Sequence, residues 1–256
     1  MELVGWQRAA AWSVVVVVPV IVLAAARRAG AAWLLSALFA GAVALTVFVW
    51  AVARHYEDHR SAALSEGSEK LGLSFQGEES PFGAADERAL MLLTAGYSRQ
   101  LRNVMRGHVE GREVVLFEFQ YSEERLTRRH RVFDQTVAAF PLGRLVPDFQ
   151  LTLRPSSALF QEVTVGEAFS GFKPVDLPAP ARFARRWMVR ARDEEAVRRL
   201  FGRAVIEFFE KHDPGGGWVV EGGGRWLLVY QPEQRVREGE LSSFVRRTSR
   251  IASAFA

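Results

Sequence analysis

The pattern of apolar residues divides the chain into two unlike parts. Two long stretches without a charged residue stand at its beginning, residues 9–26 (AAAWSVVVVVPVIVLAAA) and 31–53 (AAWLLSALFAGAVALTVFVWAVA). Helices of these lengths would measure about 27 and 34 Å, and the hydrocarbon core of a bilayer is about 30 Å thick. Both stretches therefore predict membrane-spanning helices, and Pro19 predicts a kink in the first.

The residues around these stretches are typical of membrane–water interfaces. Only residues 27–30 (RRAG) separate the stretches, which predicts a tight antiparallel hairpin over residues 1–56. Aromatic and basic side chains near the helix ends form the predicted membrane-interface set: Trp6, Trp12, Arg27, Arg28, Trp33, Trp50, Arg54 and Tyr56. The alternative for the first stretch is a cleaved signal peptide, because Arg8 and residues 24–26 resemble its charged start and its cleavage site.

The distribution of basic residues gives an orientation. Four of them lie near the membrane on the side of the two chain ends, against Arg27 and Arg28 in the connecting loop: Arg8, Arg54, Arg60 and Lys70. Since loops rich in Lys and Arg stay in the cytoplasm, we expect a multi-pass protein of the cell inner membrane with a cytoplasmic globular part.

The rest of the chain has the pattern of one soluble domain. Residues 57–72 are polar and predict a stalk helix, followed by a domain over residues 73–256. Residues 101–109 and 113–121, joined by a turn at 110–112, predict a β-hairpin with one buried face, because every second residue from Val115 to Tyr121 is apolar. Further strands are expected at 128–140, 149–153 and 187–191.

Helices interrupt these strands. Asp86 is expected to cap a helix that ends near residue 95, and a second helix is expected over residues 193–212. The glycine-rich residues 222–224 are interpreted as the turn of a second hairpin, followed by a terminal helix from about Gly239. The predicted fold class is α+β, a mainly antiparallel sheet packed with helices, displayed by a transmembrane helical hairpin.

Composition removes several classes of function. The chain has no cysteine, which excludes thiol catalysis and Cys-ligated metal centres. Lys and Arg total 33 against 29 Asp and Glu, so the charge is nearly balanced and no polybasic nucleic-acid signature is present. The glycine triplets lack the following Lys-Ser/Thr of a phosphate-binding loop, and no cofactor is expected.

Few residues are candidates for chemistry. His55 and His59 have the spacing of a metal-binding helix, but Tyr56 stands where a zincin motif has Glu, so no metal site is predicted. Asp134 and His130 fall on predicted strands, where a hydrolase would place polar groups, although local hydrogen bonding is the favoured interpretation. Catalytic residues remain unassigned.

Arginines gather in several clusters, around residues 128–131, 182–192, 198–203 and 246–250. The acidic residues 193–195 lie close by in sequence, so pairing and solvation are the favoured interpretation for much of this charge. Arg246, Arg247 and Arg250 flank the apolar stripe of the terminal helix and are candidate lipid-contact residues. Packing of that stripe onto the sheet is favoured over contact with lipid.

Several segments carry a family resemblance: residues 92–121, FDQTVAAF (133–140), LVPDFQLTLRP (145–155) and EAFSGF (167–172). Its recognisable marks are Asn103, Gly107 and Gly111, with Gln135-Thr136 and Pro147-Asp148-Phe149. With the two apolar stretches, the chain resembles a group of uncharacterised bacterial membrane proteins that have two N-terminal transmembrane helices and a C-terminal domain of unknown function. The resemblance implies an anchored α+β module and supplies no catalytic residue.

Three functions remain open. The leading hypothesis is a non-catalytic interaction or assembly module, with the bilayer and a protein partner or a second copy as its partners and no nucleic acid. The alternatives are a hydrolase acting near the membrane through Asp134 and His130, and a module that binds anionic lipid through the terminal helix.

Overall fold

The computed structural model describes residues 32–124, 130–154, 171–212 and 217–256. The chain divides into two compact units, Met1–Arg60 and Ser61–Ala256. The first predicted span, residues 9–26, lies outside the described residues, and so do Trp6, Trp12, Arg27 and Arg28.

The second predicted span lies in helix α2 (Ala32–Glu69), which also contains most of the predicted stalk. The stretch from Leu38 onward is long and apolar enough to cross a membrane, and none of its most apolar window is buried inside the protein. Leu38, Phe48 and Trp50 each expose more than half of their surface. The described residues therefore contain one candidate membrane helix, where two were predicted for the whole chain. The stalk is not a separate element, because its polar sequence continues the same helix.

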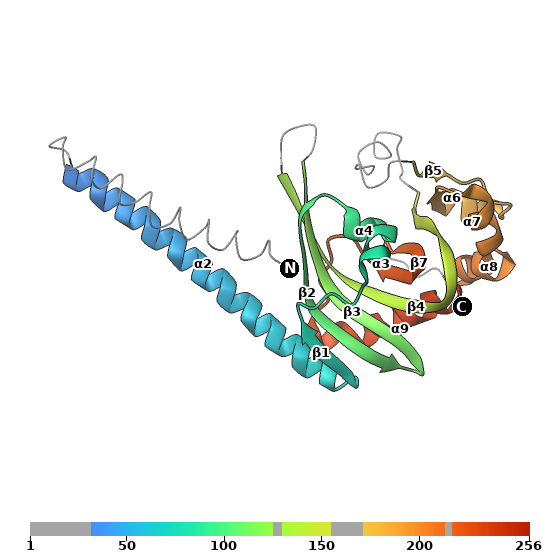
Figure 1. Ribbon diagram of the computed structural model, residues 1–256, viewed down its shortest axis with the longest axis horizontal. Coiled ribbons are helices and arrows are strands. Elements are labelled where there is room, and N and C mark those ends of the chain that lie inside the picture. Colours follow the sequence, from blue (N-terminus) through green and yellow to red (C-terminus); the bar gives the residue numbers. More distant parts are fainter. Residues whose placement is uncertain (1–31, 125–129, 155–170, 213–216) are drawn as a thin grey trace. The chain divides into compact units, whose positions relative to one another are not determined.

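The second unit is built on a seven-stranded antiparallel sheet (Figure 1). Its strands follow the order β1-β2-β3-β4-β6-β5, and β7 pairs with β4 outside this path. The bounds are β1 (Leu73–Gly77), β2 (Tyr97–Val109), β3 (Arg112–Glu124), β4 (His130–Leu153), β5 (Lys173–Pro174), β6 (Trp187–Ala191) and β7 (Val219–Tyr230). The coarse prediction of an α+β domain with a mainly antiparallel sheet is confirmed.

The predicted hairpin is present as β2 and β3. Its turn places Glu110 and Gly111 at positive φ, 53° and 76°, as a two-residue hairpin loop of this kind requires. The expectation of one buried face is wrong, because Val114 and Val115, which point to opposite faces, are both fully buried. Both faces of the sheet are covered, so the polar alternation expected of a half-exposed strand is interrupted.

Two strands that were predicted separately form one continuous strand in the structure. Residues 128–140 and 149–153 were expected to form separate strands, whereas β4 runs through both regions as a strand of 24 residues. It pairs with β3 and then with β6, and with β7 over its middle. Irregular register around Val146 marks where the strand bends between its partners.

The second predicted hairpin is wrong, because residues 219–230 form the single strand β7. Two of its three glycines serve close packing, and the third, Gly224, has a positive φ of 60°. A Cβ on Gly222 would lie 2.3 Å from the Phe149 ring, and one on Gly223 would lie 2.4 Å from the carbonyl oxygen of Ala89. Glycine is needed where the backbone approaches a neighbour this closely.

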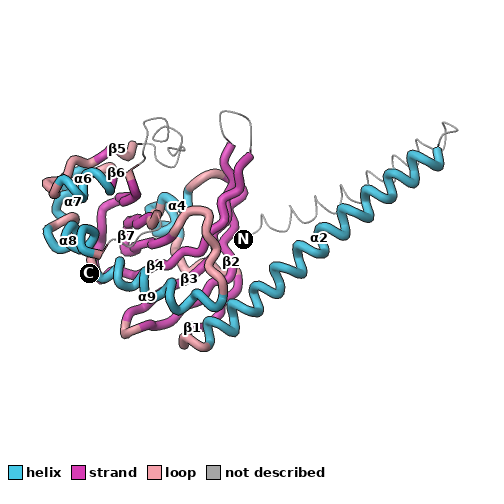
Figure 2. The backbone as a smooth tube through the Cα atoms, turned by 180° about the vertical axis from the view of Figure 1, so that it is seen from behind, coloured by secondary structure: helices cyan, strands magenta, loops and turns pink. Residues whose placement is uncertain are grey.

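Short helices cover the two faces. On one face, α3 (Ala84–Ala89) and α4 (Met91–Thr94) lie over a cluster that includes Phe117, Trp226 and Leu228. On the other lie α6 (Ala181–Arg186), α7 (Glu194–Leu200), α8 (Arg203–Lys211) and α9 (Leu241–Ser253), which follows a short 3-10 turn (Glu238–Glu240). Figure 2 shows α9 crossing the sheet on the face opposite α4.

Two helix predictions need correction. The helix expected over residues 193–212 is divided into α7 and α8, and Gly202 is the N-cap of α8. Asp193 does cap α7, since its side chain accepts a hydrogen bond from the Ala196 amide. The earlier helix begins after Gly83 instead of at Asp86, and the extended backbone of Leu90 divides it into α3 and α4.

Candidate functional site

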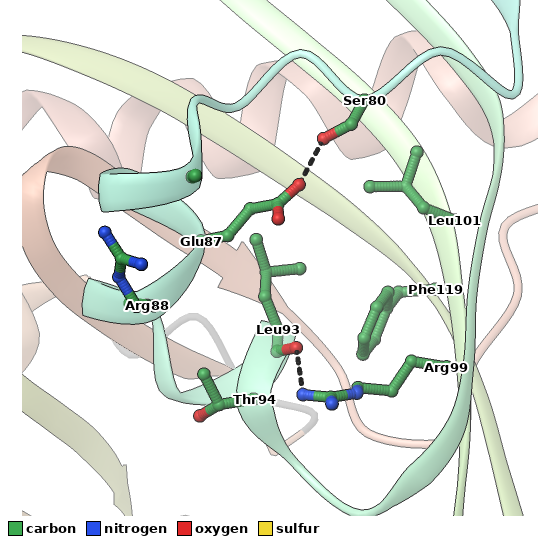
Figure 3. A pocket seen from close by; sticks show the side chains of 9 residues that line it. Ser80, Glu87, Arg88, Leu93, Thr94, Arg99, Leu101 and Phe119 are labelled. Atoms are coloured by element: carbon green, nitrogen blue, oxygen red, sulfur yellow. Dashed lines mark hydrogen bonds between the residues drawn. The ribbon is translucent and has the colours of Figure 1, made fainter. Parts of the chain in front are cut away.

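A hollow of about 420 Å³ opens beside α3 and α4 (Figure 3). Leu101 from β2 and Phe119 from β3 line one side of it, and Leu93 from α4 faces them. This volume lies in the range of sites that receive a small molecule or a side chain. Five of the nine lining residues are polar or charged, and Leu93 and Phe119 are themselves buried, so the hollow is mixed in character and apolar mainly along one wall.

Charged groups stand at the two ends of this hollow. At one end, the Ser80 hydroxyl donates to the Glu87 carboxylate at 2.7 Å. At the other, the Arg99 guanidinium donates to the carbonyl oxygen of Leu93 at 3.1 Å (Figure 3). Arg88 also belongs to the rim. The arrangement suits an apolar group flanked by polar or charged groups.

A buried charge network lies on the opposite face of the sheet and is centred on Glu118. The Asn103 amide donates to the Glu118 carboxylate at 2.7 Å, and the Arg235 guanidinium donates to it at 2.8 and 3.3 Å. The Glu118 side chain is fully buried. Two charge-assisted hydrogen bonds from Arg235 satisfy a carboxylate that burial would otherwise penalise heavily.

The same network contains Asp134, one of the two residues proposed for a hydrolase. Its Oδ2 atom lies 3.2 Å from the Arg102 guanidinium and 3.4 Å from the Arg235 guanidinium. Period-two alternation on β4 places Asp134 on the face of Thr136 and Ala138, as predicted. Asp134 is therefore engaged by two arginines, which matches the local bonding that the sequence favoured.

The network also reaches the last turns of α2. The Ser61 hydroxyl donates to the Asn103 side-chain oxygen at 2.7 Å, and Leu64 is buried in the core of the domain. Asn103 has φ of 52°, a conformation that Asn adopts more readily than most residues. This bulged position of β2 allows the Asn103 side chain to bond both to Ser61 and to Glu118.

A second buried glutamate was not singled out from the sequence. Glu221 of β7 is fully buried, and its carboxylate accepts from the Leu92 amide at 2.8 Å and from the Tyr230 hydroxyl at 3.4 Å. Burial raises its pKa to about 8, against the opposing effect of backbone hydrogen bonds from Leu92 and Met91. The signal in the sequence was an acidic residue directly after the apolar Trp218–Val220.

Gln150 stands between Glu221 and an arginine in the strand register. It lies opposite Glu221 on β7 and opposite Arg190 on β6. All three side chains are buried, and burial lowers the pKa of the Arg190 guanidinium. Asp148 lies one pair away on the same face, and burial raises its pKa although Arg192 opposes the shift.

Among the described membrane-interface residues, Trp50, Arg54 and Tyr56 lie on α2 with exposed side chains. The Arg54 guanidinium stands 5.7 Å from the centre of the Trp50 ring, a cation–π distance. Trp33 lies in α2, but its side chain is outside the described part. Their contact with a membrane stays a prediction.

The histidine pair predicted at helical spacing is close in space. The Nε2 atoms of His55 and His59 lie 3.1 Å apart on exposed α2. Within the described ranges, no three His, Cys, Asp or Glu side chains are placed to hold a metal ion. His130 begins β4, and its side chain is not described.

The apolar stripe of the terminal helix is buried in the domain. Leu241, Phe244 and Ile251 of α9 belong to the core, so the favoured packing of this stripe onto the sheet is confirmed. Arg246, Arg247 and Arg250 are exposed on the other side of the helix. Their contact with lipid stays a prediction, and it would rest on charge alone because the stripe is already covered.

No protein-family model and no curated protein matches the chain. Among solved structures, it is similar to the crystal structure of the mycobacterial trehalose monomycolate transport factor A, TtfA, with 14% sequence identity and a TM-score of 0.48. The similarity covers 76% of this chain and 93% of that chain. At this TM-score, the likeness does not establish a function.

Proposed function

We propose that the protein is a membrane-anchored interaction module that binds a protein partner without catalysing a reaction. The observation that carries the proposal is helix α2, which combines an exposed apolar stretch of bilayer length with an end that is hydrogen-bonded and packed into the domain. An exposed surface with residues such as Leu45 and Phe48 is stable in a bilayer and costly in water.

The network around Asp134 supports the non-catalytic alternative over the hydrolase. A general base must reach a substrate, whereas the described contacts of Asp134 are to Arg102 and Arg235. Glu221 has a raised pKa but is fully buried against Leu92 and Tyr230. Both carboxylates are used in the packing of the domain.

The hollow beside α3 and α4 is the proposed contact for the partner. Its apolar wall at Leu101 and Phe119, with Glu87 and Arg99 at the two ends, fits an apolar side chain carried by a polypeptide with charged flanks. A protein partner explains why a domain with this hollow is held at a membrane, since tethering raises the effective concentration of both molecules.

The arrangement in the membrane is also proposed. Residues 9–26 would form a second span, and the basic residues near the chain ends would keep the domain in the cytoplasm of a bacterial cell. Because the chain has no cysteine, a single Cys at Arg203 or at Ala29 labels one position only. The Arg203→Cys thiol should react with an impermeant maleimide only after permeabilisation, and the Ala29→Cys thiol in intact spheroplasts. The reverse pattern contradicts this orientation.

Membership of the resembled bacterial family is proposed as well. Three residues that carry the family resemblance, Asn103, Gly107 and Gly111, lie at positions where the backbone geometry or a buried hydrogen bond favours these residue types. A Cβ on Gly107 would lie 2.8 Å from the carbonyl oxygen of Gly72, Gly111 has positive φ, and Asn103 bonds to Glu118. The marks thus support a shared fold and assign no chemistry.

A photo-crosslinking amino acid at Thr94, on the rim of the hollow, tests the interaction function in native membranes. The full chain should give a discrete crosslinked band whose mass identifies a second copy or another protein. The matched control places the same group at Arg203, an exposed position on α8. Equal, diffuse crosslinking at both positions, or none at Thr94, contradicts the proposal.

A further inference from the structure

Arginines surround a second hollow, of about 480 Å³, at the end of β4. The residues that line it are Leu153, Arg154, Arg182, Arg185 and Arg186. Among the described residues, no acidic side chain lines it. Four guanidinium groups around one hollow produce a positive local potential, although the whole chain is nearly balanced in charge. The acidic side chain of Glu210 shares a small adjoining cavity with Arg182 and Arg186.

The geometry of this hollow is fixed by the backbone. The Arg154 amide donates to the carbonyl oxygen of Arg186 at 2.7 Å, and the Arg154 guanidinium donates to that of Ala184 at 2.8 Å. Phe183 is buried in the core and holds α6 in place. Arg182, Arg185 and Arg186 stand at i, i+3 and i+4, so they share one side of the helix.

The acidic residues that follow in sequence do not neutralise the hollow. Glu194 pairs with Arg198 at 2.7 Å, and Glu195 pairs with Arg199 at 2.6 Å. Asp193 accepts the amide of Ala196 as the cap of α7. The pairing expected from the sequence for the arginine clusters is therefore met at Arg198 and Arg199, and these contacts of residues 193–195 all lie on α7.

Two of the four arginines, Arg182 and Arg185, keep their hydrogen-bond donors available for a ligand. Arg182 and Arg185 are exposed, and neither makes an ion pair or side-chain hydrogen bond with the described part of the chain. Planar guanidinium groups bind phosphate oxygens through paired hydrogen bonds, which are shorter and stronger than bonds between neutral groups. A phosphate carries the charge and the several acceptors that converging arginines require.

We propose that this arginine hollow is a binding site for phosphate groups, supplied by an anionic lipid head group or by a soluble phosphate compound. The site lies on elements that take no part in the hollow beside α3 and α4. It is also distinct from Arg246, Arg247 and Arg250 of α9. The phosphate-binding proposal can therefore be tested independently of the proposed partner binding.

The first arm of the test uses inorganic pyrophosphate with the full chain in a non-ionic detergent. Isothermal titration at low salt should show binding to the natural protein, and R182Q/R185Q should bind at least about tenfold more weakly. The matched control is R198Q/R199Q, which removes the same charge from arginines already paired on α7. The control should bind like the natural protein.

The second arm distinguishes the source of the phosphate. Native mass spectrometry of the three proteins counts bound phosphatidylglycerol, with phosphatidylcholine as the neutral comparison. A loss of phosphatidylglycerol confined to R182Q/R185Q, without pyrophosphate binding, assigns the site to a lipid head group. Pyrophosphate binding with unchanged lipid counts assigns it to a soluble compound.

Folding is controlled in both arms, because the two double variants should keep the circular dichroism spectrum of the natural protein. If R182Q/R185Q and R198Q/R199Q behave alike with both probes, the proposal is overturned. The same conclusion follows if neither probe binds any of the three proteins.

Discussion

Glu118 and Glu221 are both fully buried, on opposite faces of one sheet, and they are stabilised in different ways. Glu118 faces the guanidinium of Arg235 and the amide of Asn103. Glu221 faces two backbone amides, including that of Leu92, and the hydroxyl of Tyr230. One site supplies a full positive charge, and the other supplies only dipoles.

The difference teaches how a buried carboxylate comes to be charged or neutral. Burial alone penalises the ionised form of both residues. Around Glu221, dipoles do not offset that penalty, and its pKa rises to about 8, so the protonated form prevails at neutral pH. Around Glu118, the paired bonds from Arg235 offset it, provided that the arginine stays in place.

The largest expected effect is a pH dependence that belongs to Glu221. Its pKa is about 8 in the folded protein, against an ordinary value of 4.5 for a glutamate, so the folded state binds more protons than the unfolded state between these pH values. The free energy of unfolding should therefore fall by roughly 3 to 4 kcal/mol between pH 5 and pH 8 because of this group. Glu221→Gln should remove that fall, as measured by urea unfolding of the full chain in detergent.

Asp148 contributes to the same pH dependence. Burial raises its pKa too, so it adds to the fall in the same direction in both proteins, and its charge is also one cause of the raised pKa of Glu221. Tyr230 titrates above this range, because its pKa is raised above its ordinary value. Identical pH profiles for the natural protein and Glu221→Gln would show that Glu221 is not neutral at pH 7.

The second largest effect is expected from breaking the ion pair between Glu118 and Arg235, on the face of the sheet opposite Glu221. Glu118→Gln keeps the shape of the side chain but removes the nearer of the two carboxylates that Arg235 contacts, leaving Asp134 at 3.4 Å. The expected cost is about 2 to 4 kcal/mol at pH 7. The matched control is Glu113→Gln, which removes the surface pair with Arg106 and should cost less than about 1 kcal/mol. Equal losses in the free energy of unfolding for both variants would contradict the contrast.

The smallest expected effect concerns Gly223, which lies on β7 two residues after Glu221 and packs closely against α3. Gly223→Ala would place a Cβ 2.4 Å from the carbonyl oxygen of Ala89, which forces α3 away from β7 and costs about 1 to 3 kcal/mol. Gly143→Ala is the control, since nothing lies within 4 Å of its Cβ. The thermal unfolding midpoint should fall for Gly223→Ala alone, and an unchanged midpoint would refute this account of the glycine triplet.

Local pattern predicted the elements whose neighbours lie close in sequence. The β2–β3 hairpin follows from alternation and from a turn at Glu110–Gly111, and β6 has the predicted bounds Trp187–Ala191. The stripe of α9 follows from helical periodicity. Pattern failed at residues 222–224, because a glycine needed for close approach to Phe149 and Ala89 has the same sequence signature as a glycine in a turn.

The candidate sites were less predictable. The interpretation of Asp134 as locally bonded agrees with the structure, but its partners Arg102 and Arg235 are far apart in sequence. The arginine clusters were expected to pair with acidic residues near them in sequence, which holds for Arg198 and Arg199. Among the described residues, however, no acidic side chain lines the hollow formed around residues 182–186. Adjacency in sequence does not determine which charges meet.

The sequence by itself determined the apolar helix of bilayer length, the α+β class and the amphipathic terminal helix, because each depends on composition or on a periodicity within one segment. Only the tertiary structure decided that both faces of the sheet are covered, that Glu118 meets Arg235 while Glu221 meets backbone amides, and that four arginines surround one hollow. Burial and charge pairing are properties of residues brought together from distant segments, and the energy of each ionised group depends on those neighbours.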